Sequence, residues 1–254
     1  MRSSRTMLTI VALAFVASMI LSAYRGAAQE TPPPEYLASG KICGMCHKEQ
    51  HTAWSETLHA KQKAADDAAP DVKFRHMTGY DSLGDKAEQG VSCEACHGPG
   101  KPHMSAPLDK KKGTSIVPNK LEDPLAAVAV CGQCHSQGAM PDGTKYPKGF
   151  LPGQKLPEGY TLAATVEGDT RLRQLNDMRQ SKHAEKGVTC ITCHTAHGGM
   201  QAKPQLRKPL NALCNDCHPT QADMTHAKTA KPDSKCSDCH MPDKRHVFQT
   251  PPEQ

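Results

Sequence analysis

The sequence has few of the residues from which a globular core is usually built. Hydrophobic residues make up 37% of the 254 residues and aromatic residues 4%, whereas an ordinary domain has roughly 45 to 50% apolar residues. Alternating strand patterns are almost absent, and the segment YTLAATV at 160–166 is the one candidate strand. Side chains alone would therefore form a poor core. Either the chain is largely disordered, or something other than side chains fills its interior.

Long apolar runs are also absent, except at the N-terminus. Arg2 and Arg5 precede an apolar stretch at 7–21, and small residues at 26–28 precede Gln29. The stretch is shorter than the roughly 20 residues that a membrane-spanning helix needs, so an uncleaved anchor is the weaker alternative. The arrangement is typical of a secretory signal peptide. We predict a signal peptide over 1–28 and a soluble mature chain over 29–254, exported to the periplasm or beyond the cell.

The mature chain lacks an excess of charge of either sign. The sequence has 31 Lys and Arg, of which Arg2, Arg5 and Arg25 fall in the predicted signal, leaving 28 against 26 Asp and Glu. This balance favours no nucleic-acid partner. The one basic cluster, at 110–112, is predicted to be a solvated loop rather than a docking site.

No cysteine is left outside a single repeated frame. All twelve occur in six Cys-x-x-Cys-His motifs. The motifs are CGMCH (Cys43, Cys46, His47), CEACH (Cys93, Cys96, His97), CGQCH (Cys131, Cys134, His135), CITCH (Cys190, Cys193, His194), CNDCH (Cys214, Cys217, His218) and CSDCH (Cys236, Cys239, His240).

This frame is the attachment signature of haem c. Two thiols three positions apart on one helical turn reach the two vinyl groups of a haem, and the adjacent imidazole binds the iron as proximal ligand. Disulfides and zinc sites also use cysteine pairs, but neither requires a histidine after every pair. We therefore predict six haem c groups, which would supply the missing core. The chain without haem is expected not to fold.

Eight histidines lie outside the motifs, and six of them follow a repeating plan. The chain divides into three units, at about 41–110, 125–200 and 210–248, each with a motif, a histidine, a second motif and a histidine. Such a self-repeat is typical of a quasi-linear array. We predict that the six are distal iron ligands, with His51 and His76 as possible alternates. The six are His59, His103, His183, His197, His226 and His246.

The predicted fold is mainly α-helical with extensive coil, a core of stacked haems and three dihaem units. The segment 47–67 has the pattern of one helix. Asp123 and Pro124 are suited to be the N-cap and first turn of another helix, which would continue into Cys131.

The words around the motifs resemble those of a known family. GVSCEACHGPGKPH at 90–103, CITCHTAHGG at 190–199 and the run from LCNDCH to CSDCHMPDKRH at 213–246 resemble periplasmic multihaem c-type cytochromes. They are most similar to the decahaem electron-transfer subunits of respiratory reductase systems and to the tetrahaem cytochromes of nitrifying bacteria. The resemblance implies low-spin haems with two histidine ligands, stacked closely enough for electrons to hop. The chain departs from the decahaem members in having six motifs, and from pentahaem nitrite reductases in having no CxxCK variant.

These observations favour an electron carrier rather than an enzyme. We expect it to pass electrons from a quinol-oxidising membrane cytochrome to a terminal reductase or an outer-membrane conduit, without stable membrane insertion of the mature chain. Two alternatives stay open. One is a haem enzyme that acts on a small nitrogen oxyanion or hydroxylamine at an iron with an open side. The other is a filament-forming extracellular cytochrome.

Overall fold

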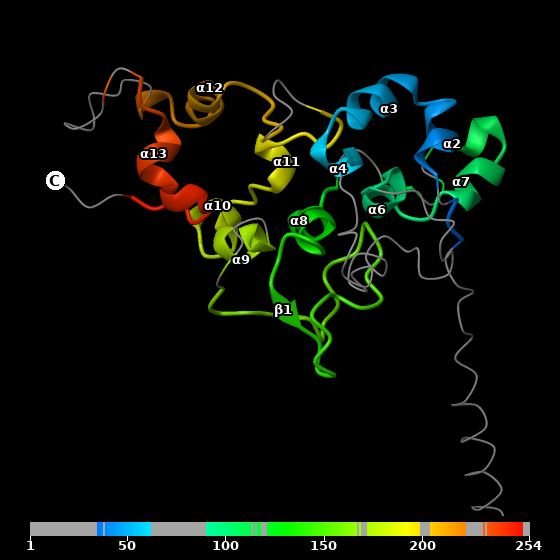
Figure 1. Ribbon diagram of the computed structural model, residues 1–254, viewed down its shortest axis with the longest axis horizontal. Coiled ribbons are helices and arrows are strands. Elements are labelled where there is room, and N and C mark those ends of the chain that lie inside the picture. The colour runs from blue at the N-terminus through cyan, green and yellow to red at the C-terminus, as the bar shows by residue number, and fades with distance from the viewer. Residues whose placement is uncertain are drawn as a thin grey trace, which may run out of the picture. The chain divides into compact units, whose positions relative to one another are not determined.

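Short helices joined by coil make up the part of the chain that the computed structural model describes (Figure 1). That part comprises residues 35–37, 39–61, 90–112, 114, 116–117, 121–166, 168, 172–198, 204–221, 231 and 233–250. The predicted signal peptide, His76 and His226 lie outside it. Glu35–Gln254 forms one compact unit. Across the described ranges, no helix has the length and apolarity required to cross a membrane.

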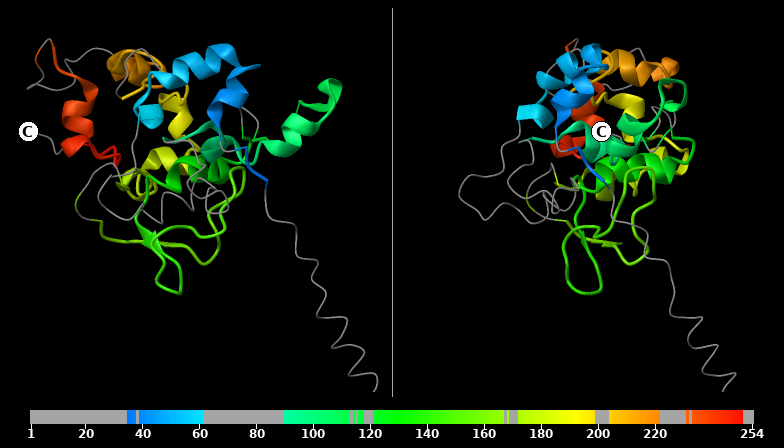
Figure 2. Two further views of the ribbon diagram at one scale, coloured as in Figure 1. Left: turned by 45° about the vertical axis from the view of Figure 1, so that its right-hand side comes forward. Right: turned by 90° about the vertical axis from the view of Figure 1, so that its right-hand side faces the viewer.

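The elements follow one another in a simple order. The first group is α2 (Gly40–Gly44), α3 (Lys48–Ser55), α4 (Leu58–Lys61), α6 (Cys93–His97), α7 (Lys101–Ser105) and the 3-10 helix η3 (Leu108–Lys110). The middle group is α8 (Pro124–Gly132), β1 (Gly138–Ala139), β2 (Thr161–Leu162), α9 (Gln174–Met178), α10 (Lys182–Glu185) and α11 (Cys190–Cys193). The last group is α12 (Leu210–Asn215), η5 (Pro219–Gln221), α13 (Cys236–His240) and η7 (Pro242–Lys244). Both views in Figure 2 show long coil between these helices.

The predicted helix into the third motif is confirmed. The Asp123 side chain accepts a hydrogen bond from the Leu125 N–H at 2.8 Å, and α8 begins at Pro124. A carboxylate at this position satisfies a backbone donor that has no partner within the helix. The helix then runs through Cys131 and ends at Gly132.

The helix predicted over 47–67 is interrupted, and its last part, 62–67, lies outside the described residues. Helix α3 ends at Ser55, and α4 begins after Thr57, whose hydroxyl accepts from the Ala60 N–H at 3.2 Å. A threonine that bonds the backbone three residues on starts a new turn rather than continuing the old one. The candidate strand at 160–166 forms only Thr161–Leu162, paired antiparallel with Gly138–Ala139.

The apolar core is small, as the composition predicts. Nine hydrophobic side chains are buried in the described ranges, and four of these nine are alanines. The largest side chains with under 2% exposure are Thr57, Asp177 and Ser136, none of which is apolar. The mainly helical, coil-rich fold class is therefore confirmed, and side chains do little to fill its interior.

A repeated contact joins two motifs to the histidine that precedes each of them. Val91 N–H donates to the His59 carbonyl at 2.8 Å, and Val188 N–H donates to the His183 carbonyl at 3.0 Å. Each valine follows a glycine with positive φ, 97° at Gly90 and 73° at Gly187. The repeated Gly-Val word thus places a CxxCH segment against the backbone of a predicted distal ligand.

Candidate haem-binding sites

Each CxxCH motif lies at the end of a short helix, and the end alternates along the chain. In the first, third and fifth motifs the helix ends one residue after the first cysteine, in α2, α8 and α12. In the second, fourth and sixth motifs the helix begins at the first cysteine, in α6, α11 and α13. This alternation gives the chain a period of two motifs. It fits the three predicted units.

Within a motif, helical hydrogen bonds bring the histidine close to the first cysteine. The histidine N–H donates to the carbonyl of the first cysteine at 2.9 Å in the first motif, between His47 and Cys43. The same bond joins His135 to Cys131 at 2.9 Å. One turn therefore carries two thiols and one imidazole, which is the arrangement that a covalently attached haem requires.

Thiols of neighbouring motifs contact one another in the same way in each predicted unit. The first cysteines of the two motifs meet, and hydrogen bonds join Cys43 to Cys93, Cys131 to Cys190 and Cys214 to Cys236. All twelve cysteines lie in the described residues, and none is in a disulfide. In a haem-loaded chain these sulfur atoms would be thioethers and could not donate hydrogen bonds. The contacts therefore indicate which motifs are neighbours in space.

Burial and these contacts change the acidity of the thiols. The hydrogen bond that Cys93 donates to Cys43, with burial, raises the pKa of Cys93 far above its ordinary value. Burial raises the pKa of Cys96 to about 11. Donation from Cys131 lowers the pKa of Cys190.

Contacts between units continue the chain of motifs. The Cys96 sulfur lies near that of Cys131, and the Cys193 sulfur lies near that of Cys217. Gln133, 2% exposed, donates from Nε2 to the Ala95 carbonyl at 2.8 Å. This bond links the second and third motifs directly. The motifs thus neighbour one another in the order of the sequence.

Histidines of the first five motifs each face a second histidine across a similar gap. The ring centroids lie 5.8 to 6.3 Å apart, and each pair joins one CxxCH histidine to one predicted distal ligand. The pairs are His47 with His103, His97 with His197, His135 with His59, His194 with His246 and His218 with His183.

The gap matches an iron with two axial imidazoles. A metal–imidazole bond of about 2.0 to 2.1 Å on each side, plus about 1.1 Å from each nitrogen to its ring centroid, gives roughly 6.3 Å. Rings in direct aromatic contact also occur at such distances. All five contacts, however, pair a CxxCH histidine with a predicted distal ligand, which favours an iron between the two rings over simple ring packing. The residues present therefore fit haem iron.

Hydrogen bonds at Nδ1 leave the other ring nitrogen available in five imidazoles. An oxygen atom that can only accept lies 2.9 to 3.2 Å from Nδ1, so Nδ1 carries the proton and Nε2 is the ligating atom. The acceptors are the carbonyls of Val117 for His97, Lys111 for His103, Pro204 for His194 and Gln249 for His240, and Oε1 of Gln174 for His135.

Burial keeps four of the predicted distal histidines neutral, which is the form that binds a metal. Burial, together with the facing imidazole, lowers the pKa of His59, His183 and His197. The pKa of His246 falls to about 4 for the same two reasons, burial being the larger. These four rings would bind iron without first losing a proton at neutral pH.

The remaining predicted residues are placed differently. His51 packs against Trp54, with ring centroids 5.6 Å apart, and its ring occupies the space that a side chain at Gly44 would need. His76 and His226 lie outside the described residues.

The sequence did not predict two residues that hold these histidines. Lys111, assigned to a solvated cluster, donates from Nζ to the carbonyls of His103 and Met104 and accepts from His103 Nδ1. Gln174, on α9, holds His135. Neither residue belongs to a recognisable motif, and only the fold brings each to its histidine.

Comparisons with known proteins find similar CxxCH sequences. Residues 182–223 match a family model described as a doubled CXXCH motif. The chain is 24% identical over 199 residues to the dissimilatory sulfite reductase MccA of Wolinella succinogenes, covering 64% of this chain and 24% of the reductase. It is 25% identical over 235 residues to cytochrome c-554 of Nitrosomonas europaea, covering 70% of this chain and 98% of that protein.

A solved structure has a similar fold. The outer cell wall cytochrome OcwA superposes with a TM-score of 0.58 at 18% identity, over 84% of this chain and 79% of that one. At 18% identity, this similarity supports a shared fold but not a shared function. The chain spans about a quarter of the sulfite reductase, so the activity of that enzyme does not transfer with the similarity.

Proposed function

Because the chain is a multihaem c-type cytochrome, we propose that it is an electron carrier in which electrons hop along six covalently attached haems. Haem supplies the one-electron chemistry when bound. The protein attaches each haem, holds its iron between two imidazoles and sets its distance from the next.

The proposed sites use the residues that the sequence predicts. Thioether bonds would form at the twelve motif cysteines, namely Cys43, Cys46, Cys93, Cys96, Cys131, Cys134, Cys190, Cys193, Cys214, Cys217, Cys236 and Cys239. The proximal ligands would be His47, His97, His135, His194, His218 and His240. The distal ligands would be His59, His103, His183, His197, His226 and His246.

The observation that carries this proposal is the set of five facing imidazole pairs at 5.8 to 6.3 Å. An iron with two imidazoles has no position for a substrate. Such an iron changes oxidation state without binding or releasing a ligand, which suits a carrier. The pairs therefore favour electron transfer over catalysis at the irons concerned.

The contacts between motifs support transfer in sequence order. Sulfur contacts within units and between units place each motif beside the next, from the first to the sixth. A haem attached at each motif would then have a neighbour on either side, except at the two ends. Electrons would enter and leave near the first and the sixth haem.

The charge of the loaded protein bears on its partners. The mature chain has 28 basic and 26 acidic residues. A ferric haem with two neutral ligands and two propionates adds one negative charge, so six haems would bring the net charge to about −4, and to about −10 when reduced. We expect salt-sensitive docking to a basic surface. A quinol-oxidising membrane cytochrome as donor and a terminal reductase or outer-membrane conduit as acceptor fit an exported protein.

The similarity to a sulfite reductase supports a second candidate, a haem enzyme with one open iron. The two functions differ in one measurable property. An open iron is high-spin when ferric and binds carbon monoxide when reduced, whereas an iron with two imidazoles is low-spin and does not.

The test uses the full chain produced in a host that attaches haem c. Mass spectrometry after removal of the signal peptide counts the haems, and the carrier requires six. Electron paramagnetic resonance (EPR) of the ferric form and CO titration of the reduced form then count open irons. Entirely low-spin haems without CO binding support the carrier. Formation of a CO adduct by one haem per chain would contradict the carrier proposal and support the enzyme.

A further inference from the structure

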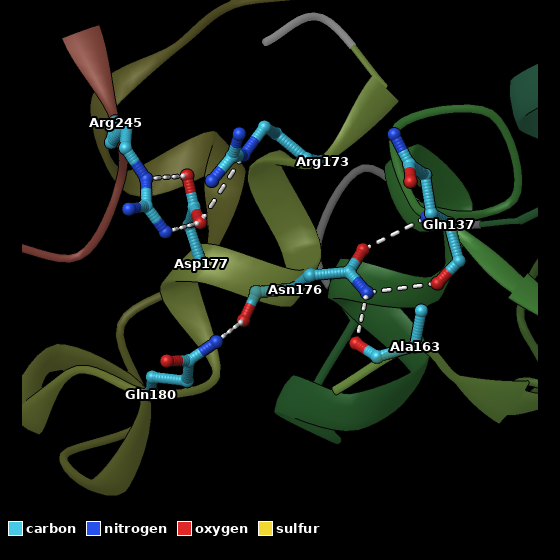
Figure 3. A network of polar contacts seen from close by, with 7 residues as sticks. All are labelled: Gln137, Ala163, Arg173, Asn176, Asp177, Gln180 and Arg245. Carbon is cyan, nitrogen blue, oxygen red and sulfur yellow. Dashed lines mark hydrogen bonds and ion pairs between the residues drawn. The ribbon is translucent and has the colours of Figure 1, made fainter. Parts of the chain in front are cut away.

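Helix α9 is fixed to the coil that follows the third motif. The Asn176 side chain, 4% exposed, accepts from the Gln137 N–H at 2.9 Å and donates to the carbonyls of Gln137 and Ala163 at 2.8 and 3.0 Å (Figure 3). The Leu175 N–H donates to the His135 carbonyl at 3.0 Å. Because these bonds satisfy the Asn176 side chain on both of its atoms, α9 is a well-anchored platform.

The next residue of α9 directs a buried carboxylate at the C-terminal segment. Asp177 is 1% exposed, and its Oδ1 lies 2.7 Å from a terminal nitrogen of Arg245. The Arg245 Nε approaches Oδ2 at 3.4 Å, which makes the contact two-pronged (Figure 3). The backbone N–H of His246 donates to the same carboxylate. Arg173, one turn earlier, adds a second positive charge at 3.5 Å.

The electrostatic balance keeps this carboxylate charged. Burial alone would raise the pKa of Asp177, but the hydrogen bonds and charge of Arg245, with Arg173 and the His246 N–H, hold the pKa below its ordinary value. An ion pair of this geometry restrains both partners, since loss of one leaves a buried charge without compensation.

The segment that Arg245 belongs to is strained and needs such a restraint. Asp243 and Lys244, directly before it, have φ of 54° and 60°, in the left-handed region that residues with a side chain seldom adopt. Strained backbone persists only where surrounding contacts hold it. The same segment carries His246, whose ring faces His194 at 6.1 Å.

We propose that Asp177 is a positioning residue for the fourth haem, which restrains Arg245 and the His246 backbone so that the His246 imidazole stays opposite His194. The inference rests on the proposed function, because it requires His194 and His246 to be ligands of one iron. It adds a residue outside the proposed ligand set, from a different part of the chain.

The test compares single substitutions in the haem-loaded chain at full haem content. His246→Ala is the reference, and it should convert one haem of the six to a high-spin form that binds CO when reduced. Asp177→Ala should give the same signature at the same haem. Asp177→Asn keeps an oxygen for the His246 N–H but loses the ion pair, so a smaller fraction of the molecules should have this haem in the high-spin form. Arg245→Lys keeps a positive charge and should fall closer to the unsubstituted protein.

Two controls separate positioning from a general loss of structure. Asp142 also accepts a backbone N–H, that of Thr144 at 2.9 Å, and faces Lys148 at 3.8 Å, but its side chain is 54% exposed. Asp142→Ala should leave all haem spectra unchanged. Added imidazole should restore the low-spin spectrum of both His246→Ala and Asp177→Ala, because only a ligand has been displaced.

The outcomes distinguish failure of the His194 and His246 ligand pair from failure of the Asp177 positioning role. If His246→Ala leaves every haem low-spin, the ligand pair of the proposed function is wrong. If His246→Ala gives the high-spin signature and Asp177→Ala, with six haems, does not, the positioning role is wrong. Should Asp177→Ala fail to acquire six haems, Asp177→Asn and Arg245→Lys decide, and unchanged spectra in both overturn the role.

Discussion

The imidazoles of His97 and His197 lie almost parallel, with planes 6° apart and ring centroids separated by 5.8 Å. Other pairs are close to perpendicular, at 74° for His59 with His135 and 83° for His183 with His218. Axial ligands are one of the means by which a protein tunes haem iron. Parallel rings donate to the same iron d orbital and separate it from its partner, whereas perpendicular rings leave the two orbitals nearly equal in energy.

We therefore expect two classes of low-spin signal in the EPR spectrum of the ferric protein. The haem between His97 and His197 should give an ordinary rhombic signal, and the two haems with perpendicular rings should give strongly anisotropic signals with a larger maximum g value. Substitution of His197 should remove intensity from the rhombic class, and substitution of His59 from the anisotropic class. The opposite assignment would contradict the ring geometry.

Replacing His197 by alanine should leave one iron with a single imidazole. We expect one haem of the six to become high-spin when ferric and to bind CO when reduced, measured by EPR and visible absorption. His51→Ala is the matched control, because His51 packs against Trp54 rather than against a CxxCH histidine of the described residues. A high-spin signal in His51→Ala would show that His51 is itself an iron ligand.

Gly90 and Gly143 offer a matched pair of glycine substitutions. Both have positive φ, at 97° and 86°, but a methyl group at Gly90 would lie 2.5 Å from the Ala60 carbonyl oxygen, and at Gly143 it would meet nothing within 4 Å. Gly143→Ala should cost about 1 kcal/mol of unfolding free energy from backbone strain. Gly90→Ala should cost roughly 1 to 3 kcal/mol more from the collision.

The difference is measurable as a shift in the midpoint of guanidinium unfolding, followed by circular dichroism of the haem-loaded protein. Equal shifts in the two variants would mean that the close approach of the second motif to the His59 segment does not contribute to stability.

Preventing haem attachment should leave the chain unfolded. The buried hydrophobic side chains of the described residues are few and mostly small, and the largest fully buried side chains are polar or charged. Without haem, apolar burial is too small to offset the conformational entropy of the chain. The measurement is circular dichroism and amide proton dispersion of a chain produced without haem attachment machinery. A cooperative thermal transition in that sample would refute the expectation.

The motif residues could be predicted because their chemistry is local. Two cysteines and a histidine within five positions are brought together by one helical turn, and no tertiary information is required. Asp123 was predictable as an N-cap for the same reason, since its partner Leu125 is two residues away. The break at Thr57 was not, because the helical pattern continues through it and nothing in the sequence shows that its hydroxyl bonds the Ala60 N–H and is buried.

The pairing of ligands depends on tertiary structure, and the sequence left it open. His103 faces His47 within the first unit, whereas His197 faces His97 in the unit before its own. Nothing in the spacing separates these two cases. Asp177 lies in no motif, and its carboxylate contacts Arg245 across 68 positions of the chain.

Four of the five imidazole pairs join histidines from two different units. Both junctions use one pattern: the intermediate histidine of a unit faces the first motif histidine of the next, and the second motif histidine faces the final histidine of the next. Under the proposed ligand set, loss of the middle unit would leave His59 with His218 and His97 with His246 as equivalent partners at the new junction. Such a protein could gain or lose whole units by duplication or deletion without substitutions that supply a new histidine.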